Sequence, residues 1–340
     1  MRAVATPGSA AADAEQVVHV RVPASSANLG PGFDALGLAL SCYDDLELRV
    51  TGSGLHIEIE GEGRDLAGAG EGHLVIQAVR AGFAAFADGG AQPSGLALRC
   101  VNRIPHGRGL GSSAAAIVGG LLAARALSAG PGADQGMLLR LATKLEGHPD
   151  NVAACLAGGL TIAWTTSHGP RLTRLEPLPQ LRPVLFIAPA DVAVRTEVAR
   201  KALPQAVPHH EAAANAGRAA LLVAALTQNQ AAAELFDATA DWLHQAYRAQ
   251  AMPDTYALVT ALRAERVPAV VSGAGPSVLA FTQAAADFDR LDSIAAQTGK
   301  AWHISSLDVA RQGARLLRPG IGGLSKILLP RDTGDCEGMP

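Results

Sequence analysis

A glycine- and serine-rich stretch, PHGRGLGSSAAAIVGG at residues 105–120, has the composition of a phosphate-binding loop. The strand-like segment 96–104 leads into it, and an apolar segment with helical spacing begins at Ser112. Free backbone N–H groups and the dipole attract anions to the start of a helix, where a serine can cap the helix or reach a phosphate-bound metal ion. The loop lacks the GK[ST] ending of a Walker A motif and the glycine spacing of a dinucleotide-binding turn. A connection that holds no ligand, with Ser112 or Ser113 as its cap, is the alternative.

Three further stretches concentrate polar side chains or glycines. The expected turn ASSANLGPGFDALGLAL (24–40) carries Asn28 and Asp34, and LEGHPDNVAA (145–154) places Glu146, Asp150 and Asn151 between two helical segments. The stretch SGAGPSVLAF (272–281) is a second glycine-rich turn. Each pattern alone is more often a cap or a tight turn. Together they offer a phosphate cradle, acidic metal ligands and polar groups for an acceptor hydroxyl, which phosphoryl transfer requires.

Two groups of elements must position these stretches. In the first, the segments 17–22, 46–50, 55–60, 96–104 and 159–164 have strand patterns, and 73–87, 112–128 and 137–147 have helical spacing. We therefore expect one domain over residues 17–168. The polar, proline-containing segment 165–182 is its expected boundary.

The second group predicts a domain over residues 180–310. Strand patterns occupy 183–189, 268–273, 278–282 and 301–307, and helical segments lie near 211–227, 230–249, 254–265 and 284–298. Without the additional helices, the order is β-α-β-β-α-β, the ferredoxin-like plan. Residues 1–16 read as a disordered tail and residues 311–340 as a loosely ordered one.

Composition excludes several classes of protein. The 340 residues, 49% of them hydrophobic, can form two cores. The net charge is only −3 and no basic block occurs, which argues against nucleic-acid binding. No segment approaches the ~20 apolar residues that span a bilayer. The four cysteines lie far apart without metal-binding spacing. We expect a cytoplasmic protein that does not bind membranes, and the sequence leaves a monomer or a homodimer open.

The chain resembles the GHMP family of small-molecule kinases, and within it most closely the homoserine kinases. Three motifs carry the resemblance, in the family's order: PASSANLGPGFDALGLAL, PHGRGLGSSAAA and VVSGAGPSVLAF. The segment EGHPDN also lies where that family has it. The resemblance covers residues 17–310. It implies an α+β fold, with an N-terminal domain like domain 2 of ribosomal protein S5 and a C-terminal ferredoxin-like domain. The implied reaction is the transfer of the γ-phosphoryl group of ATP, with Mg²⁺, to the hydroxyl of L-homoserine.

The resemblance also implies a role for individual residues. The residues implied to bind ATP are Pro105, Gly107, Arg108, Gly109, Leu110, Gly111, Ser112, Ser113, Ala114 and His73. Those implied to bind Mg²⁺ are Ser113 and Glu146. The residues implied to bind the amino acid are Asn28, Asp34, Asp150, Asn151, Arg195, Arg248, Gly273 and Gly275. The two arginines among them are implied to bind its carboxylate from both sides. Asp150, Asn151, Ser113 and Glu146 form the catalytic set; Asp150 can accept a proton, and we expect His148 to orient the turn.

Two positions depart from the family pattern. His73 stands where many relatives have an asparagine that touches the adenine, and Lys144 stands where many have an acidic residue. We favour Glu146 as the metal ligand because the EG before HPDN is intact. Two alternatives stay open: a GHMP kinase for another small alcohol, such as mevalonate or a diphosphocytidyl sugar alcohol, and a GHMP-fold sensor that binds its ligand without turnover.

Overall fold

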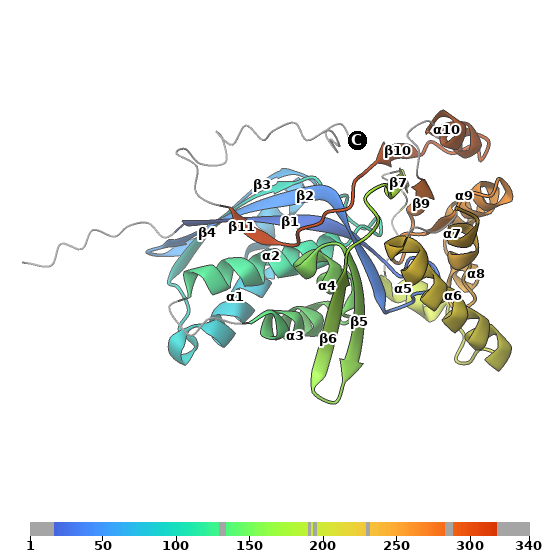
Figure 1. The fold of residues 1–340 in the computed structure, drawn as a ribbon. Coiled ribbons are helices and arrows are strands. Elements are labelled where there is room, and N and C mark those ends of the chain that lie inside the picture. Colours follow the sequence, from blue (N-terminus) through green and yellow to red (C-terminus); the bar gives the residue numbers. More distant parts are fainter. Residues whose placement is uncertain are drawn as a thin grey trace, which may run out of the picture.

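Two β-sheets, each covered by helices, make up the fold (Figure 1). The computed structural model describes residues 17–128, 134–189, 192, 196–228, 232–282 and 288–317. The expected tail at residues 1–16 lies outside these ranges. Across the described ranges, no helix combines the length and apolar character that a membrane span needs.

The larger sheet has seven strands and is built mainly from the first half of the chain. Its strands are β1 (Val17–Ala27), β2 (Leu36–Thr51), β3 (Gly54–Gly61), β4 (Gly95–Asn102), β5 (Leu160–Thr166), β6 (Gly169–Leu175) and β11 (Arg315–Leu317). The strand order is β11-β1-β2-β4-β3, with β5 paired to β2 and β6 paired to β5. The buried strands β1 and β2 end and begin at the turn that carries Asn28 and Asp34.

Four helices lie along one face of this sheet: α1 (Leu74–Phe86), α2 (Ser112–Leu127), α3 (Gln135–Glu146) and α4 (Asp150–Ala157) (Figure 1). The short 3-10 helices η1 (Arg64–Gly72) and η2 (Asp88–Gly90) flank α1. Helix α2 is central, and its small residues allow close packing: a Cβ on Gly119 would lie 2.3 Å from Leu46 Cδ1, and one on Gly120 would lie 2.6 Å from Val75 O. This packing holds the start of α2, and with it the glycine-rich loop, against the sheet.

The four-stranded second sheet has the order β10-β7-β9-β8, with every pair antiparallel. Its strands are β7 (Arg182–Ile187), β8 (Ala269–Val271), β9 (Val278–Thr282) and β10 (His303–Ser306). The helices of this half are α5 (Thr196–Lys201), α6 (His209–Thr227), α7 (Ala232–Ala238), α8 (Gln245–Arg248), α9 (Pro253–Ala264) and α10 (Phe288–Ala296). The predicted β-α-β-β-α-β order is confirmed, with α5 to α9 between the first two strands.

Three sequence-based expectations differ from the structure. Residues 24–40 are not one turn, because β1 continues to Ala27 and β2 starts at Leu36; both faces of these strand ends are buried, which hides the alternation. The expected boundary at 165–182 contains β6, which forms a hairpin with β5. The expectation of a loose tail from residue 311 is wrong for residues 315–317, which form β11 against β1.

Candidate active site

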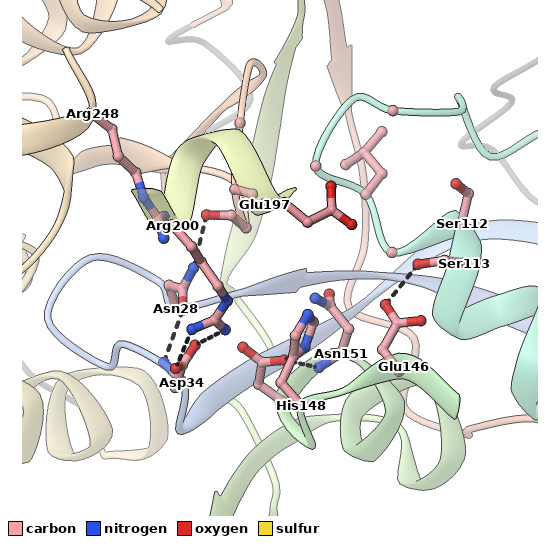
Figure 2. A pocket seen from close by; sticks show the side chains of 18 residues that line it. Asn28, Asp34, Ser112, Ser113, Glu146, His148, Asn151, Glu197, Arg200 and Arg248 are labelled. Atoms are coloured by element: carbon pink, nitrogen blue, oxygen red, sulfur yellow. Dashed lines mark hydrogen bonds and ion pairs between the residues drawn. The ribbon is translucent and has the colours of Figure 1, made fainter. Parts of the chain in front are cut away.

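A cavity of about 290 Å³ lies between the loops of the two sheets (Figure 2). We call it the acceptor cavity. Its lining residues are Asn28, Asp34, Gly107, Gly109, Leu110, Gly111, Ser112, Ser113, Glu146, His148, Asp150, Asn151, Glu197, Arg200, Arg248, Gly273, Ala274 and Gly275. The structure thus brings together most of the residues that the sequence singled out, from five separate stretches of chain. Pro105, Arg108 and Ala114 do not line it, and Arg195 lies outside the described residues.

The glycine-rich loop has the backbone form that binds anions. Gly107, Gly109 and Gly111 have φ values of +67°, +74° and +68°, while the residues between them stay at negative φ. Such alternation turns successive N–H groups toward one side and forms an anion-binding nest. A Cβ on Gly109 would lie 2.2 Å from Ser272 O, and one on Gly111 would lie 2.1 Å from Ser25 Oγ, so the loop also needs glycine for close packing.

The serine cap on α2 that the sequence allowed is not formed. Gly111, in the left-handed region, is the N-cap residue, and no side chain caps the helix. Ser112 and Ser113 are the first residues of the helix, and both line the cavity. Ser113 Oγ instead donates a hydrogen bond to Glu146 Oε1 at 2.6 Å. The first-turn hydroxyls are therefore placed beside the free N–H groups of the helix start rather than used to satisfy them.

Glu146 ends helix α3 and faces Ser113 (Figure 2). Gly147, with φ of +96°, ends the helix, and the side chain of Leu145, just before Glu146, is 38% exposed. Burial raises the pKa of Glu146, against the opposing effects of the Ser113 hydrogen bond and the charge of His148. Within the described part of the chain, no lysine or arginine pairs with this carboxylate. Its oxygens, with the Ser113 hydroxyl, form a compact oxygen donor set.

His148, Asp150 and Asn151 form the next group, at the start of α4. The His148 ring donates from Nδ1 to Asp150 Oδ1 at 2.8 Å, and this bond raises the pKa of His148. The same Oδ1 accepts the Asn151 N–H at 2.7 Å, and Asp150 is 2% exposed. Ser25 Oγ donates to Asn151 Oδ1 at 3.0 Å. The expectation that His148 orients the turn agrees with its contact, since the ring is bound to the side chain of Asp150.

The turn after β1 has a strained backbone, and two of its side chains, Asn28 and Asp34, line the cavity. Asn28, Leu29 and Asp34 have φ values of +68°, +52° and +55°, a region that non-glycine residues rarely occupy. Asn28 Nδ2 donates to Gly273 O at 2.8 Å, and its Oδ1 accepts the Asp34 N–H at 2.9 Å. One side chain therefore links the turn of the first sheet to the glycine-rich turn of the second.

Arg200 is a functional candidate that the sequence reasoning missed. It lies on α5 and donates to both oxygens of Asp34, at 2.9 Å and 2.6 Å (Figure 2). The sequence pattern had favoured Arg195 in the same segment. No local signal in the sequence distinguishes Arg200 from Arg195, and only the fold brings α5 to Asp34.

Arg248 lies at the end of α8 and is almost fully buried, with 1% exposure. It donates from Nε to Ala199 O at 3.2 Å and from Nη1 to His244 Nδ1 at 3.1 Å. It forms no ion pair with any carboxylate in the described ranges, and burial lowers its pKa to about 10. A buried guanidinium without a counter-charge is costly unless a ligand supplies one.

A second cavity, of about 310 Å³, shares Ser112 and Ser113 with the first. We call it the apolar cavity; it is lined by Val22, Asp44, Leu46, Leu66, Ala69, Gly72, His73, Leu74, Val75, Asn102, His106, Ser112, Ser113, Ala115 and Ala116. His73 is 7% exposed and its Nδ1 has no hydrogen-bond partner among the described residues. Burial, followed by the neighbouring His106, lowers the pKa of His73, so a neutral imidazole faces this cavity.

Comparison with known proteins identifies close relatives. Residues 73–159 match the model of the GHMP kinases N terminal domain. A homoserine kinase from Streptomyces coelicolor is 53% identical over 302 residues, which cover 88% of this chain and 94% of the relative; one from Streptomyces avermitilis is 53% identical, with 88% and 95% covered. The crystal structure of homoserine kinase from Cytophaga hutchinsonii superposes with a TM-score of 0.76 at 24% identity, covering 90% of this chain and 99% of that one.

Proposed function

The chain belongs to the homoserine kinase family of GHMP kinases, and we propose that its acceptor cavity is where homoserine receives the γ-phosphoryl group of ATP. The enzyme is a phosphotransferase that acts on an alcohol. Family membership does not favour another small alcohol or a sensor without turnover.

We propose that the nucleotide spans both cavities. The apolar cavity suits a nucleobase, with the neutral His73 as its polar contact. From there the phosphates reach the glycine-rich loop, because Ser112 and Ser113 line both cavities. The backbone N–H groups of residues 107–113 then bind the phosphate oxygens, helped by the dipole of α2. Arg108 and Ala114 remain proposed members of this loop.

Mg²⁺ fits the pair formed by Ser113 and Glu146. Hydroxyl and carboxylate oxygens are ligands that Mg²⁺ prefers, and a buried carboxylate without a basic partner in the described ranges suits a cation. When bound there with ATP, the ion supplies charge neutralisation of the phosphates. Lys144, two residues before Glu146 on α3, is exposed and does not line the acceptor cavity, which supports Glu146 as the ligand of this segment.

The acceptor side holds the amino acid by its charged groups. Arg248 and Arg200 offer guanidinium donors for the carboxylate, and Asn28 and Asp34 offer acceptors for the ammonium group. The hydroxyl oxygen attacks the γ-phosphorus, the bond from that phosphorus to the bridging oxygen breaks, and ADP leaves. Asp150 accepts the hydroxyl proton at Oδ2, since Oδ1 already accepts from His148 and from the Asn151 N–H. Asn151 orients the hydroxyl, and the loose transition state needs little early deprotonation.

One observation carries the substrate assignment. The cavity that begins at a phosphate-binding loop ends at Arg248, a buried guanidinium that forms no ion pair in the described part of the chain. Mevalonate has a carboxylate but no ammonium group, and a diphosphocytidyl sugar alcohol has neither, so neither acceptor uses Arg248 together with the Asp34 carboxylate. An amino acid needs both.

A coupled ADP-release assay over a panel of alcohols tests the proposal. The panel contains L-homoserine, L-serine, mevalonate and 3-aminopropan-1-ol, which is homoserine without its carboxylate. We expect turnover with homoserine to exceed every other member by at least about a hundredfold in kcat/KM. Comparable turnover of mevalonate, or homoserine binding without ADP release, would contradict it.

A further inference from the structure

The imidazole of His244 lies directly behind Arg248, one helical turn earlier in the chain. His244 is 0% exposed and does not itself line the acceptor cavity. Its Nε2 lies 2.8 Å from Gly30 O, and its Nδ1 lies 3.1 Å from Arg248 Nη1. The ring therefore joins the strained turn after β1 to the guanidinium at the end of the acceptor cavity.

The chemistry of the two partners determines the protonation of this ring. A carbonyl oxygen can only accept, so Nε2 must carry a hydrogen and donate it to Gly30. A guanidinium can only donate, so Nδ1 must be an unprotonated acceptor for Arg248. Both conditions hold together only in the neutral Nε2–H tautomer. Burial lowers the pKa of His244, and the charge of Arg248 acts in the same direction, whereas Asp241 opposes them.

The ring is also fixed in orientation. The Phe33 ring stacks on it with centroids 5.0 Å apart, and the same Phe33 lies under the guanidinium groups of Arg248 at 5.3 Å and Arg200 at 5.6 Å. The fully buried carboxylate of Asp241 accepts the backbone N–H groups of residues 243–245, which secures the chain on which His244 stands.

We propose that His244 is a positioning residue for substrate binding: its Nδ1 holds the Arg248 guanidinium toward the acceptor cavity and so sets the affinity for the substrate carboxylate. The proposal rests on the proposed function, in which Arg248 binds that carboxylate. Arg248 has no carboxylate partner in the described part of the chain to direct it, so its orientation depends on the Phe33 ring, on Ala199 O and on His244. Loss of the Nδ1 acceptor frees the guanidinium to turn away from the substrate.

Two conservative variants separate positioning from packing. An asparagine amide reaches the position of Nδ1, and a glutamine amide reaches that of Nε2. His244→Asn therefore keeps an acceptor for Arg248 and loses the Gly30 bond, whereas His244→Gln keeps the Gly30 bond and loses the acceptor. We expect the KM for homoserine to rise about tenfold or more in His244→Gln, and to stay within about threefold of the wild type in His244→Asn. We expect little change in kcat or in the KM for ATP.

Control variants distinguish a failure of the His244 inference from a failure of the proposed carboxylate site. His19→Gln alters another buried histidine, on β1, and we expect no change in the KM for homoserine. Equal KM increases in His244→Asn and His244→Gln, or no increase in the latter, would overturn the inference. If Arg248→Met leaves the KM for homoserine unchanged, the proposed carboxylate site fails instead. Nitrogen-15 NMR of the wild-type imidazole needs no variant: a neutral Nε2–H ring is expected, and a proton on Nδ1 would contradict the proposal.

Discussion

Arg200 and Asp34 form a bidentate ion pair across the acceptor cavity, with Nη1 to Oδ2 at 2.9 Å and Nη2 to Oδ1 at 2.6 Å. The pair joins helix α5 to the turn after β1, so it connects the two halves of the chain. Its side chains are 38% and 37% exposed, so we expect solvent to screen any contribution to stability. A guanidinium has five N–H donors, and those not used by Asp34 remain for a substrate carboxylate.

Substitutions of Arg200 distinguish the effect of its positive charge from that of its planar pair of N–H donors. In Arg200→Lys the charge remains but the planar pair of donors is lost, and we expect the KM for homoserine to rise about tenfold, with a larger rise in Arg200→Ala. The KM for ATP and the melting temperature should change little in both. Steady-state kinetics with each substrate varied in turn provides the measurement. A lysine variant with wild-type KM for homoserine would show that Arg200 serves Asp34 alone.

Ser113→Ala should lower kcat by at least about tenfold, because a hydroxyl that we assign to the metal ion is lost. The melting temperature should fall by only a few degrees, since the hydroxyl does not cap α2. Ser128→Ala is the matched control: Ser128 Oγ bonds Ala124 O at the other end of the same helix, at 2.7 Å. A Ser113→Ala enzyme as active as Ser128→Ala would remove Ser113 from the reaction.

Glu146→Gln should retain the fold in metal-free buffer, lose most activity at low Mg²⁺ and recover part of it as Mg²⁺ rises. The reason is that a neutral amide is a weaker ligand than a carboxylate for a hard cation. Lys144→Ala, on the exposed face of the same helix, is the control and should leave the Mg²⁺ dependence unchanged. Activity against Mg²⁺ concentration provides the readout. An unchanged curve for Glu146→Gln would place the metal ion elsewhere.

The buried Asp44 predicts a pH dependence of stability. Its Oδ1 accepts the N–H groups of Arg103 and Ile104 at 2.6 Å and 2.9 Å, yet burial raises its pKa from 3.8 to about 7. A raised pKa means that the folded state holds the proton more tightly than the unfolded state. The protonated Asp44 therefore adds to the free energy of unfolding at low pH, and this contribution is lost as the pH rises toward 7.

Asp44→Asn keeps an oxygen acceptor and removes the ionisation. We expect the free energy of unfolding of the wild type to fall relative to that of Asp44→Asn, by on the order of a few kcal/mol between about pH 4 and about pH 7. Above that range the difference should be constant. Urea unfolding of both proteins across the range tests this. Parallel curves would mean that Asp44 ionises as readily in the folded chain as in the unfolded one.

The sequence singled out most of the residues that line the acceptor cavity, but it was less accurate for the strands around them. Motif residues such as Ser113 and Glu146 stand beside one another as expected, because the glycine-rich loop and the end of α3 each have a local signature. Arg200 was missed since nothing local distinguishes it from Arg195, and only packing places α5 over Asp34. His244 was likewise missed, because only the fold places its ring between Gly30 O and the Arg248 guanidinium. Strand β11 was missed because a three-residue strand needs its partner β1 to be stable.

The most direct test of the account compares two acceptors in one variant. Homoserine and 3-aminopropan-1-ol share the ammonium and hydroxyl groups and differ in the carboxylate that we assign to Arg248. In Arg248→Met, kcat/KM for homoserine should fall by at least about a hundredfold, while kcat/KM for 3-aminopropan-1-ol should stay within about threefold of its wild-type value. An equal loss for both acceptors would show that Arg248 supports the fold of the cavity rather than the substrate carboxylate, and would contradict the account.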